Sequence, residues 1–419
     1  MGQFATLIKR RPQPYIVGID AGEPAMTTDT DILVAGTGPA GLMAALALSR
    51  AGLPVVLVGP PVNSGDRRTT ALMKPSLEFL DRLGIGGELT TGTAPLRTMR
   101  IADATGRLLR SPTVTFRAAE IGEPYFGLNI PNARLLEILA GAVAADSAIG
   151  RIETTVDRWT LEEDKAQASL ADGGSITARL VVAADGRNSP AREAAGIAVR
   201  TRTTGQSALV LNFAHQRDHQ NISTEFHTES GPFTQVPLPG RRSSLVWVLK
   251  PSAVDEIQSV DDAALSMRIE ERMQSMLGRV EVEPGRQVYP LTSALPDRFA
   301  ARRVALVGEA AHVFPPIGAQ GLNLGIRDIE GLVGAINAVR GDPGAPEVLA
   351  AYERSRRADI MARSAAVNLL NRSLLSDMLP AQLARAAGLA LLAAAPPLRA
   401  LFMREGLRGG SGFASLFKT

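Results

Sequence analysis

Three glycines near the start of the chain have the spacing of a nucleotide-binding turn. Gly36, Gly38 and Gly41 form a G-x-G-x-x-G pattern that also contains Pro39 and Ala40. Such a turn lets a pyrophosphate approach the backbone and lie against the N-terminus of the helix that follows. Because glycines also cluster in ordinary turns, the pattern is specific only when a strand precedes it and a helix follows it.

The segments around the turn supply that context. Residues 31–35 are an apolar run typical of a buried parallel strand, residues 42–51 have helical periodicity, and residues 54–58 form a second apolar run. This β-α-β unit predicts a dinucleotide-binding fold. The acidic residue that should bind the adenosine ribose is absent, because Gly59 stands in its place. We expect backbone, water or another side chain to hold the ribose, and Gly59→Glu to tighten binding of the dinucleotide.

A second loop, far along the chain, is the other candidate for holding an anion. It follows the apolar run 303–307, is rich in glycine and proline, and leads into a helix from about residue 318. Backbone amides in such a loop, and at the start of the helix, can face negative charge. The residues expected to bind the cofactor here are Gly308, Glu309, Pro316, Gly318, Gln320, Gly321, Leu322 and Asn323.

Together with a third motif, these patterns resemble a known family. The GTGPAG turn, VVAADGRNSPAR at residues 181–192 and the run from Val304 to Asp328 occur in the order found in single-component flavin aromatic hydroxylases of the para-hydroxybenzoate hydroxylase fold. From about Asp29 to the end, the chain is similar to the hydroxylases of aerobic ubiquinone biosynthesis. The segments that carry this closer similarity are Asp66–Leu72, Gly127–Leu139, Gly231–Gly240 and Pro397–Leu407.

The resemblance implies an FAD-dependent ring hydroxylase. FAD would be reduced by NAD(P)H, the reduced flavin would react with dioxygen, and one oxygen atom would pass to a polyprenylated phenol. Other proteins of ubiquinone biosynthesis are expected as partners. Two alternatives stay open: a catabolic hydroxylase of a small soluble phenol, and a non-catalytic scaffold with a flavin-binding fold. The second is motivated by Gly59 and by Glu309, which stands where the family usually has Asp.

The resemblance also assigns cofactor contacts outside the two glycine-rich loops. Asp185 and Gly186 match the family's second fingerprint, Arg68 matches an arginine that reaches the cofactor, and Asn132 matches a polar residue at a helix start. Each has a simpler alternative. Arg68 could be a surface arginine, Asn132 could be a helix N-cap, and Asp185-Gly186 could be a plain turn.

The four histidines do not predict a metal site. His312 lies in the Gly308 loop, and the resemblance gives it a structural part or one at the flavin edge. His215, His219 and His227 accompany strands, without cysteines or a recognised carboxylate pattern beside them, so we expect structural histidines. His227 stands where the family has an aromatic residue. No G-x-S-x-G element is present, so a catalytic triad is not predicted. We name no general base, because the cofactor would carry the chemistry.

Composition narrows the classes of partner and location. The 419 residues contain 45 Lys and Arg against 42 Asp and Glu, and no cysteine, so neither a nucleic-acid surface nor a zinc-thiolate site is expected. No apolar run reaches the roughly 18–20 residues of a membrane span. We expect a cytoplasmic protein, peripheral on the inner membrane through the basic apolar helices at 381–407, although ordinary packing of these helices explains their composition equally well. Their arginines, with one just beyond, are Arg385, Arg399, Arg404 and Arg408.

The expected fold is α/β, with a discontinuous Rossmann-like FAD-binding domain, an inserted antiparallel-sheet substrate domain and C-terminal helices. We expect a disordered tail at residues 1–28, and translation could begin at Met26. The ranges are 29–74, 120–200 and 296–345 for the FAD-binding domain, 75–119 and 201–295 for the substrate domain, and 346–419 for the helical region.

Overall fold

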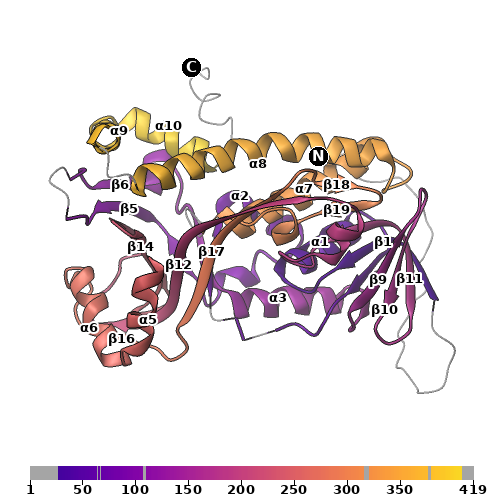
Figure 1. Cartoon of the computed structure of the whole chain (residues 1–419), viewed down its shortest axis with the longest axis horizontal. Coiled ribbons are helices and arrows are strands. Elements are labelled where there is room, and N and C mark those ends of the chain that lie inside the picture. Colours follow the sequence, from indigo (N-terminus) through magenta and orange to yellow (C-terminus); the bar gives the residue numbers. More distant parts are fainter. Residues whose placement is uncertain are drawn as a thin grey trace.

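The molecule has a sheet at each end and a long helix along one side. The computed structural model describes residues 27–63, 65–66, 68–106, 110–315, 320–375 and 379–407. Helix α8 (Pro346–Leu375) runs past both sheets (Figure 1). The mixed α/β class is therefore confirmed, whereas residues 1–26 of the expected tail lie outside the described residues.

The first sheet has parallel strands at its centre, in the order β19-β11-β1-β2-β8. Their bounds are β1 (Thr27–Ala35), β2 (Val55–Val58), β8 (Ile149–Ile152), β11 (Ser175–Ala183) and β19 (Val304–Leu306). Every residue of β2 and β19 is buried, as in parallel strands that are covered on both faces. β1 starts earlier than expected because Thr27 and Thr28 pair with Ser175 and Ile176. The antiparallel strand β18 (Ala300–Ala301) pairs with β19 at one edge, and the antiparallel strands β10 (Ala166–Leu170) and β9 (Val156–Leu161) branch from β11.

Helices around this sheet bury one large apolar core. They are α1 (Pro39–Arg50), α2 (Lys74–Arg82), α3 (Asn132–Ala145), α4 (Pro190–Ala194) and α7 (Gln320–Val339). All residues of α1 from Gly41 to Leu48 are buried. Phe79 and Leu80 of α2 join the same core, so this layer extends past the boundary expected at residue 74.

The second sheet is antiparallel except where β13 and β5 pair. Its strands are β5 (Thr98–Asp103), β6 (Val114–Arg117), β12 (Val199–His215), β13 (Ile222–Thr228), β14 (Gly231–Leu238), β15 (Arg242–Leu249), β16 (Val280–Val282) and β17 (Gln287–Pro296). One face packs against α5 (Pro251–Ser259) and α6 (Asp262–Arg272), with Phe233 and Trp247 in the core. The sequence predicts one helix here, near residues 262–277, which is α6; α5 is a further helix of nine residues that buries only Ile257.

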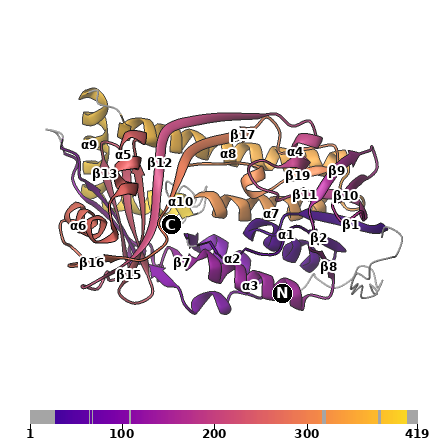
Figure 2. The same ribbon diagram turned by 60° about the horizontal axis from the view of Figure 1, so that its bottom comes forward.

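Two features join the ends of the molecule. Figure 2 shows β12 and β17 running side by side from one end towards the other, in agreement with their antiparallel pairing. A small sheet of β3 (Thr69–Met73), β7 (Gly127–Pro131) and β4 (Ala94–Leu96) places β4 and β7 beside β14 of the second sheet. The cofactor motifs and the second sheet are thus held in a fixed relation.

The C-terminal region consists of α8 and two further helices, α9 (Leu379–Ala394) and α10 (Pro396–Leu407). Met403 of α10 packs with Leu96 and Phe126, and Arg399 donates a hydrogen bond to Glu120 (2.7 Å) in the one-turn helix η2 (Ala118–Ile121). Among the described residues, no single helix has the length and apolarity of a membrane span. The segments 386–394 and 396–407 meet that test together, across a bend of 105°.

Candidate functional site

The glycine turn after β1 has the shape that the sequence predicts. Gly36 has φ +115°, and a Cβ there would lie 2.3 Å from the carbonyl oxygen of Ala184. A Cβ on Gly41 would lie 1.8 Å from the carbonyl oxygen of Gly36. A Cβ on Gly38 would meet nothing within 4 Å, and no side chain caps the start of α1. Two glycines are therefore required by close packing, and the third leaves open space in front of unpaired helix amides.

The loop after β11 lies directly against this turn. Asp185 follows Ala184, and its Oδ2 accepts a hydrogen bond from the amide of Ala191 (3.1 Å). The other oxygen, Oδ1, is buried and has no hydrogen-bond partner among the described residues. Burial raises the pKa of Asp185 above its ordinary value. Asp185-Gly186 is a turn, with Gly186 at φ +85°, but the unpaired oxygen gives it the capacity to bind a polar ligand.

The Gly308 loop closes the third side of the site. Gly308 has φ +63°, and a Cβ there would lie 2.8 Å from Cβ of Ala40, just inside α1. Arg192 donates to the carbonyl oxygen of Ala310 (2.9 Å) and to that of Arg187 (2.7 Å). The guanidinium of Arg187 lies 3.6 Å from the carboxylate of half-exposed Glu309. The three sequence motifs therefore meet at one place, which is the fit that a bound dinucleotide requires.

A buried charged network supports this loop from below. Asp328 of α7 is fully buried, and its Oδ2 accepts hydrogen bonds from the amide of Gly308 (3.0 Å) and from Nε2 of His312 (2.8 Å). Its Oδ1 accepts one from Arg356 of α8 (2.8 Å). The ring of His312 stacks on Phe314. His312 thus holds the loop in shape, as expected, and Arg356 is a supporting residue that the sequence did not reveal, because nothing local marks its partner.

Arg68 and Asn132 meet at a carboxylate that the sequence did not single out. Asp66 accepts hydrogen bonds from the guanidinium of Arg68 (Nε at 2.9 Å and Nη2 at 2.7 Å), from the amide of Arg68 (3.0 Å) and from Asn132 (2.8 Å). Burial would raise the pKa of Asp66, but these hydrogen bonds outweigh it and hold the pKa below its ordinary value. The half-exposed guanidinium of Arg68 also lies 5.7 Å from the ring of Tyr289.

The suggestion that Asn132 is an N-cap is wrong. The cap position of α3 is Pro131, without a side-chain cap. Asn132 instead accepts a hydrogen bond from Thr70 Oγ1 (2.6 Å) and donates to Asp66. Its side chain therefore joins β3 and the Asp66 loop to the start of α3.

The start of α7 contains the remaining candidates. Pro316 and Gly318 lie outside the described residues, and Gln320, Gly321 and Leu322 form the first turn of the helix. Asn323 accepts hydrogen bonds from the amide of Met73 (2.9 Å) and from Ser76 (2.7 Å), and donates to the carbonyl oxygen of Ala71 (2.8 Å). The hydrogen bonds of Asn323 therefore hold α7 against β3 and α2. A contact between its side chain and the cofactor stays a prediction.

The structure opposes the expected effect of Gly59→Glu. A Cβ at Gly59 would lie 2.9 Å from the methyl group of Thr37 and 3.0 Å from its amide nitrogen. Thr37 is held there by a hydrogen bond from its hydroxyl to the carbonyl oxygen of Pro60 (2.6 Å). The glutamate would therefore have to displace Thr37 before its carboxylate could reach a ribose.

The histidines of the second sheet form hydrogen bonds with neighbouring groups of the chain, as structural histidines do. His215 contacts the carbonyl oxygen of Arg217 (2.7 Å), and Nε2 of His219 donates to that of Leu238 (2.8 Å). His227 contacts the carboxylate of Glu225 (2.9 Å). Within the part of the chain that the structure describes, no group of His, Asp and Glu could hold a metal ion.

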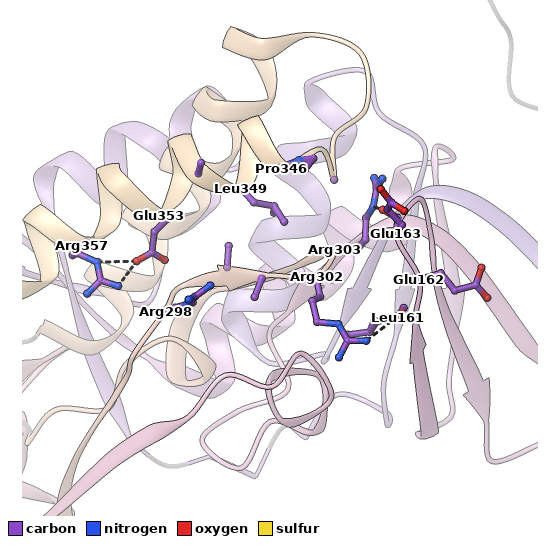
Figure 3. Close-up of a pocket in the computed structure, with 14 residues that line it drawn as sticks. Leu161, Glu162, Glu163, Arg298, Arg302, Arg303, Pro346, Leu349, Glu353 and Arg357 are labelled. Atoms are coloured by element: carbon purple, nitrogen blue, oxygen red, sulfur yellow. Dashed lines mark hydrogen bonds and ion pairs between the residues drawn. The ribbon is translucent and has the colours of Figure 1, made fainter.

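A separate pocket of about 750 Å³ lies away from these motifs (Figure 3). It is bounded by the β18–β19 hairpin and by α8, with Arg302, Leu349 and Glu353 among its lining residues. Arg302 and Arg303 form the hairpin turn with φ +46° and +66°. None of the residues expected to bind the cofactor lines this pocket, so it is not the site assembled by the motifs.

Comparison with known proteins identifies a family and a fold. The family described as FAD binding domain matches residues 29–365. The chain is 33% identical over 416 residues to the ubiquinone hydroxylase UbiL of Rhodospirillum rubrum, covering 94% of this chain and 95% of that protein. It is 28% identical to the 3-demethoxyubiquinol 3-hydroxylase of Escherichia coli, covering 86% and 94%. The crystal structure of p-nitrophenol 4-monooxygenase PnpA from Pseudomonas putida has a similar fold, with a TM-score of 0.75 at 22% identity over 92% of this chain and 99% of that one.

Proposed function

Because this chain belongs to the family of the FAD binding domain, we infer that it is an FAD-dependent monooxygenase that hydroxylates an aromatic ring in ubiquinone biosynthesis. NAD(P)H and dioxygen are its co-substrates. The observation that carries this proposal is the meeting of the three motifs, where Gly36 packs on Ala184 and Gly308 packs on Ala40. When bound, FAD supplies the redox chemistry that links NAD(P)H, dioxygen and the ring.

The chain's own groups would bind and orient the cofactor. The open space at Gly38 and the unpaired amides of α1 suit the pyrophosphate. The buried, unpaired oxygen of Asp185 and the exposed carboxylate of Glu309 suit polar groups of the sugar and sugar-alcohol parts. The start of α7 suits the negative charge of a reduced flavin ring. The Asp328 network would hold the Gly308 loop in place while these groups act.

Spectroscopy and product analysis test the proposal. The purified protein should have the absorbance of bound flavin, oxidise NAD(P)H faster when a phenol is present, and incorporate one atom of labelled dioxygen into the product. Failure to bind added FAD would favour the scaffold alternative. Bound FAD without any phenol-dependent turnover would also contradict the monooxygenase.

For the substrate, we propose a phenol with an isoprenoid tail rather than a small soluble one. The names of the relatives from R. rubrum and E. coli support this choice, and so does an apolar surface near the second sheet. Residues 386–398, from α9 into α10, contain no polar or charged side chain, and none of them is buried. A helix that is apolar on all sides normally lies in a protein core or in lipid.

We propose that this surface lies on the cytoplasmic face of the inner membrane, where other proteins of ubiquinone biosynthesis could also be reached. Arg117 of β6, which lies beside α9, is 61% exposed and would face anionic headgroups. The double variant Leu391→Ser and Phe402→Ser should lose flotation with vesicles that contain phosphatidylglycerol. The matched control is Met267→Ser on α6, an apolar residue that is 66% exposed, against 56% for Leu391 and 57% for Phe402, and lies at a distance from this surface. Equal flotation of both variants would refute the membrane contact.

A further inference from the structure

The second sheet has one face that is turned towards the cofactor motifs. Its other face carries Phe233 and Trp247 and is covered by α5 and α6. Tyr289 of β17 lies on the first face, since it pairs with Ala208 and packs with Val210 and Val248. Arg68, which the sequence predicts at the cofactor, lies over the ring of this tyrosine. In addition, Ala294 of β17 forms a bridge to Val313 in the Gly308 loop.

The polar residues on this face include a group around Glu225 on β13 and β14. Thr234 pairs with Val246 on one side and with Glu225 on the other, so all three side chains share the face. Nε2 of His227 lies 2.9 Å from one carboxylate oxygen of Glu225, and the hydroxyl of Thr234 lies 3.3 Å from the other. His227 is 4% exposed, whereas the side chain of Glu225 is 20% exposed. The histidine and the threonine thus orient a carboxylate that can accept a further hydrogen bond.

A second, independent observation lies on the small sheet opposite. Asn129 of β7 is fully buried, and neither its Oδ1 nor its Nδ2 has a hydrogen-bond partner among the described residues. Its neighbours Leu128 and Ile130 enter the core of the first sheet, so Asn129 projects from the other face of β7. That face is turned towards the second sheet, because Met73 and Leu96, which pair with Gly127 on the same face, pack in one cluster with Met99 of β5, and β7 lies beside β14.

A buried amide without partners is costly unless something else bonds to it. Among the described residues, none supplies a hydrogen bond to the side chain of Asn129. The amide offers two donors and an acceptor, and the carboxylate of Glu225 offers an acceptor. A phenol ring needs this combination, because its hydroxyl both donates and accepts, while an apolar wall of valines suits the ring itself.

We propose that Asn129 and Glu225 form the polar subsite that binds the ring hydroxyl of the phenol, with His227 and Thr234 as positioning residues for the carboxylate. This proposal rests on the proposed function and deepens it: the substrate is a phenol whose hydroxyl forms hydrogen bonds with residues on two facing sheets. The subsite fixes which edge of the ring is presented to the cofactor motifs. It involves hydrogen bonds alone and needs no further reactant.

The test uses FAD-loaded enzyme and two probes, 2-prenylphenol and prenylbenzene, which differ by the hydroxyl. Binding is measured from the change in flavin absorbance, and coupling from the ratio of hydroxylated product to NAD(P)H consumed. Asn129→Leu and Glu225→Gln should each weaken binding of the phenol by about tenfold or more and leave binding of prenylbenzene unchanged. Asn129→Leu should not lower the thermal midpoint of the substrate-free enzyme, because it removes unpaired polar atoms.

Thr224→Val is the matched control. Thr224 lies on the same strand as Glu225 and also has a buried hydroxyl without a described partner, but it faces α5 and α6. This variant should discriminate the two probes as the wild type does. Equal discrimination by all three variants would overturn the subsite alone. A wild type that holds FAD but responds to neither phenol nor prenylbenzene would overturn the proposed function and the subsite together.

Discussion

The two sheets of this protein are specialised in different ways. Around the first sheet, the candidate site is built mainly from backbone: Gly36, Gly41 and Gly308 each allow an approach that a Cβ would block. On the second sheet, the polar groups are side chains that meet only through strand pairing, such as Glu225 and Thr234. A site made of backbone leaves a pattern along the sequence, whereas a site made of paired strands does not. Substitutions at the first site should therefore lower the stability of the fold, whereas substitutions at the second should weaken binding of the substrate.

The strongest test of the backbone-built site is Asp328→Asn. Removing this charge leaves the buried guanidinium of Arg356 with its second ion pair, to Asp359 (3.0 Å), and loosens the amide of Gly308. Breaking one of its two ion pairs should cost about 3 kcal/mol, the lower end of the range for a buried pair. The unfolding free energy in urea should fall by that amount and flavin should be lost. Glu330→Gln, on the same helix but in an exposed pair with Arg82, should cost about 0–1 kcal/mol. Similar losses in the two variants would contradict a special role for the buried network.

Gly41→Ala should be the next largest effect. Its Cβ would overlap the carbonyl oxygen of Gly36, so overpacking should cost at least the upper end of the roughly 1–3 kcal/mol seen for such changes. The denaturation midpoint reports this loss.

Gly38→Ala should separate packing from binding, because its Cβ meets nothing within 4 Å. That variant should fold with a normal midpoint and still bind FAD more weakly, since the methyl group enters the space meant for the pyrophosphate. A normal FAD affinity would remove Gly38 from the site.

Asp185→Asn should change the pH dependence of the FAD-free protein. The folded state keeps a proton on Asp185 to higher pH than the unfolded chain, because burial raises its pKa. The stability that it contributes is therefore complete below the ordinary aspartate pKa, about 4, and is lost as the pH rises through the raised value. Thermal midpoints measured against pH should show this decline in the wild type and not in the variant.

The same variant tests the unpaired oxygen. If a cofactor hydroxyl bonds to Oδ1 of Asp185, FAD affinity should fall by about 1.5–3 kcal/mol, the usual value for a hydrogen bond to a charged group. Titration of the FAD-free protein with FAD measures it. An unchanged affinity would make the Asp185 loop a plain turn after all.

The smallest expected effect concerns Gly59. Gly59→Glu should lower stability by about 1 kcal/mol and should not tighten FAD binding, because its Cβ meets Thr37. Thr37→Ser removes the obstructing methyl group and keeps the hydroxyl that bonds to Pro60. The double variant should therefore recover part of the loss. Tighter binding by Gly59→Glu alone would restore the expectation drawn from the sequence.

The sequence predicted the parts of the site that are built from local backbone motifs better than the parts that depend on distant side chains. The β-α-β unit, the Asp185 turn and the Gly308 loop are local patterns, and all of them lie together in the structure. Asp66, Arg356 and Asn129 were not singled out, because their importance depends on neighbours that are distant along the chain or on bonds that are missing. The boundary of the FAD-binding domain, expected at residue 74, differs for a related reason, because α2 packs into the first core through tertiary contacts that the sequence pattern does not reveal.

The strands of the first sheet are not consecutive along the chain, and this determines the order in which they can pair during synthesis. Strands β1, β2, β8 and β11 leave the ribosome early, but β19, which pairs with β11, follows the whole second sheet. The Gly308 loop and Arg356 come later still. Stabilisation by bound cofactor therefore becomes available only when synthesis is nearly complete, since binding stabilises only the state that can bind. Until then the nascent chain has an open edge on β11, which is where a chaperone or an incorrect strand would pair.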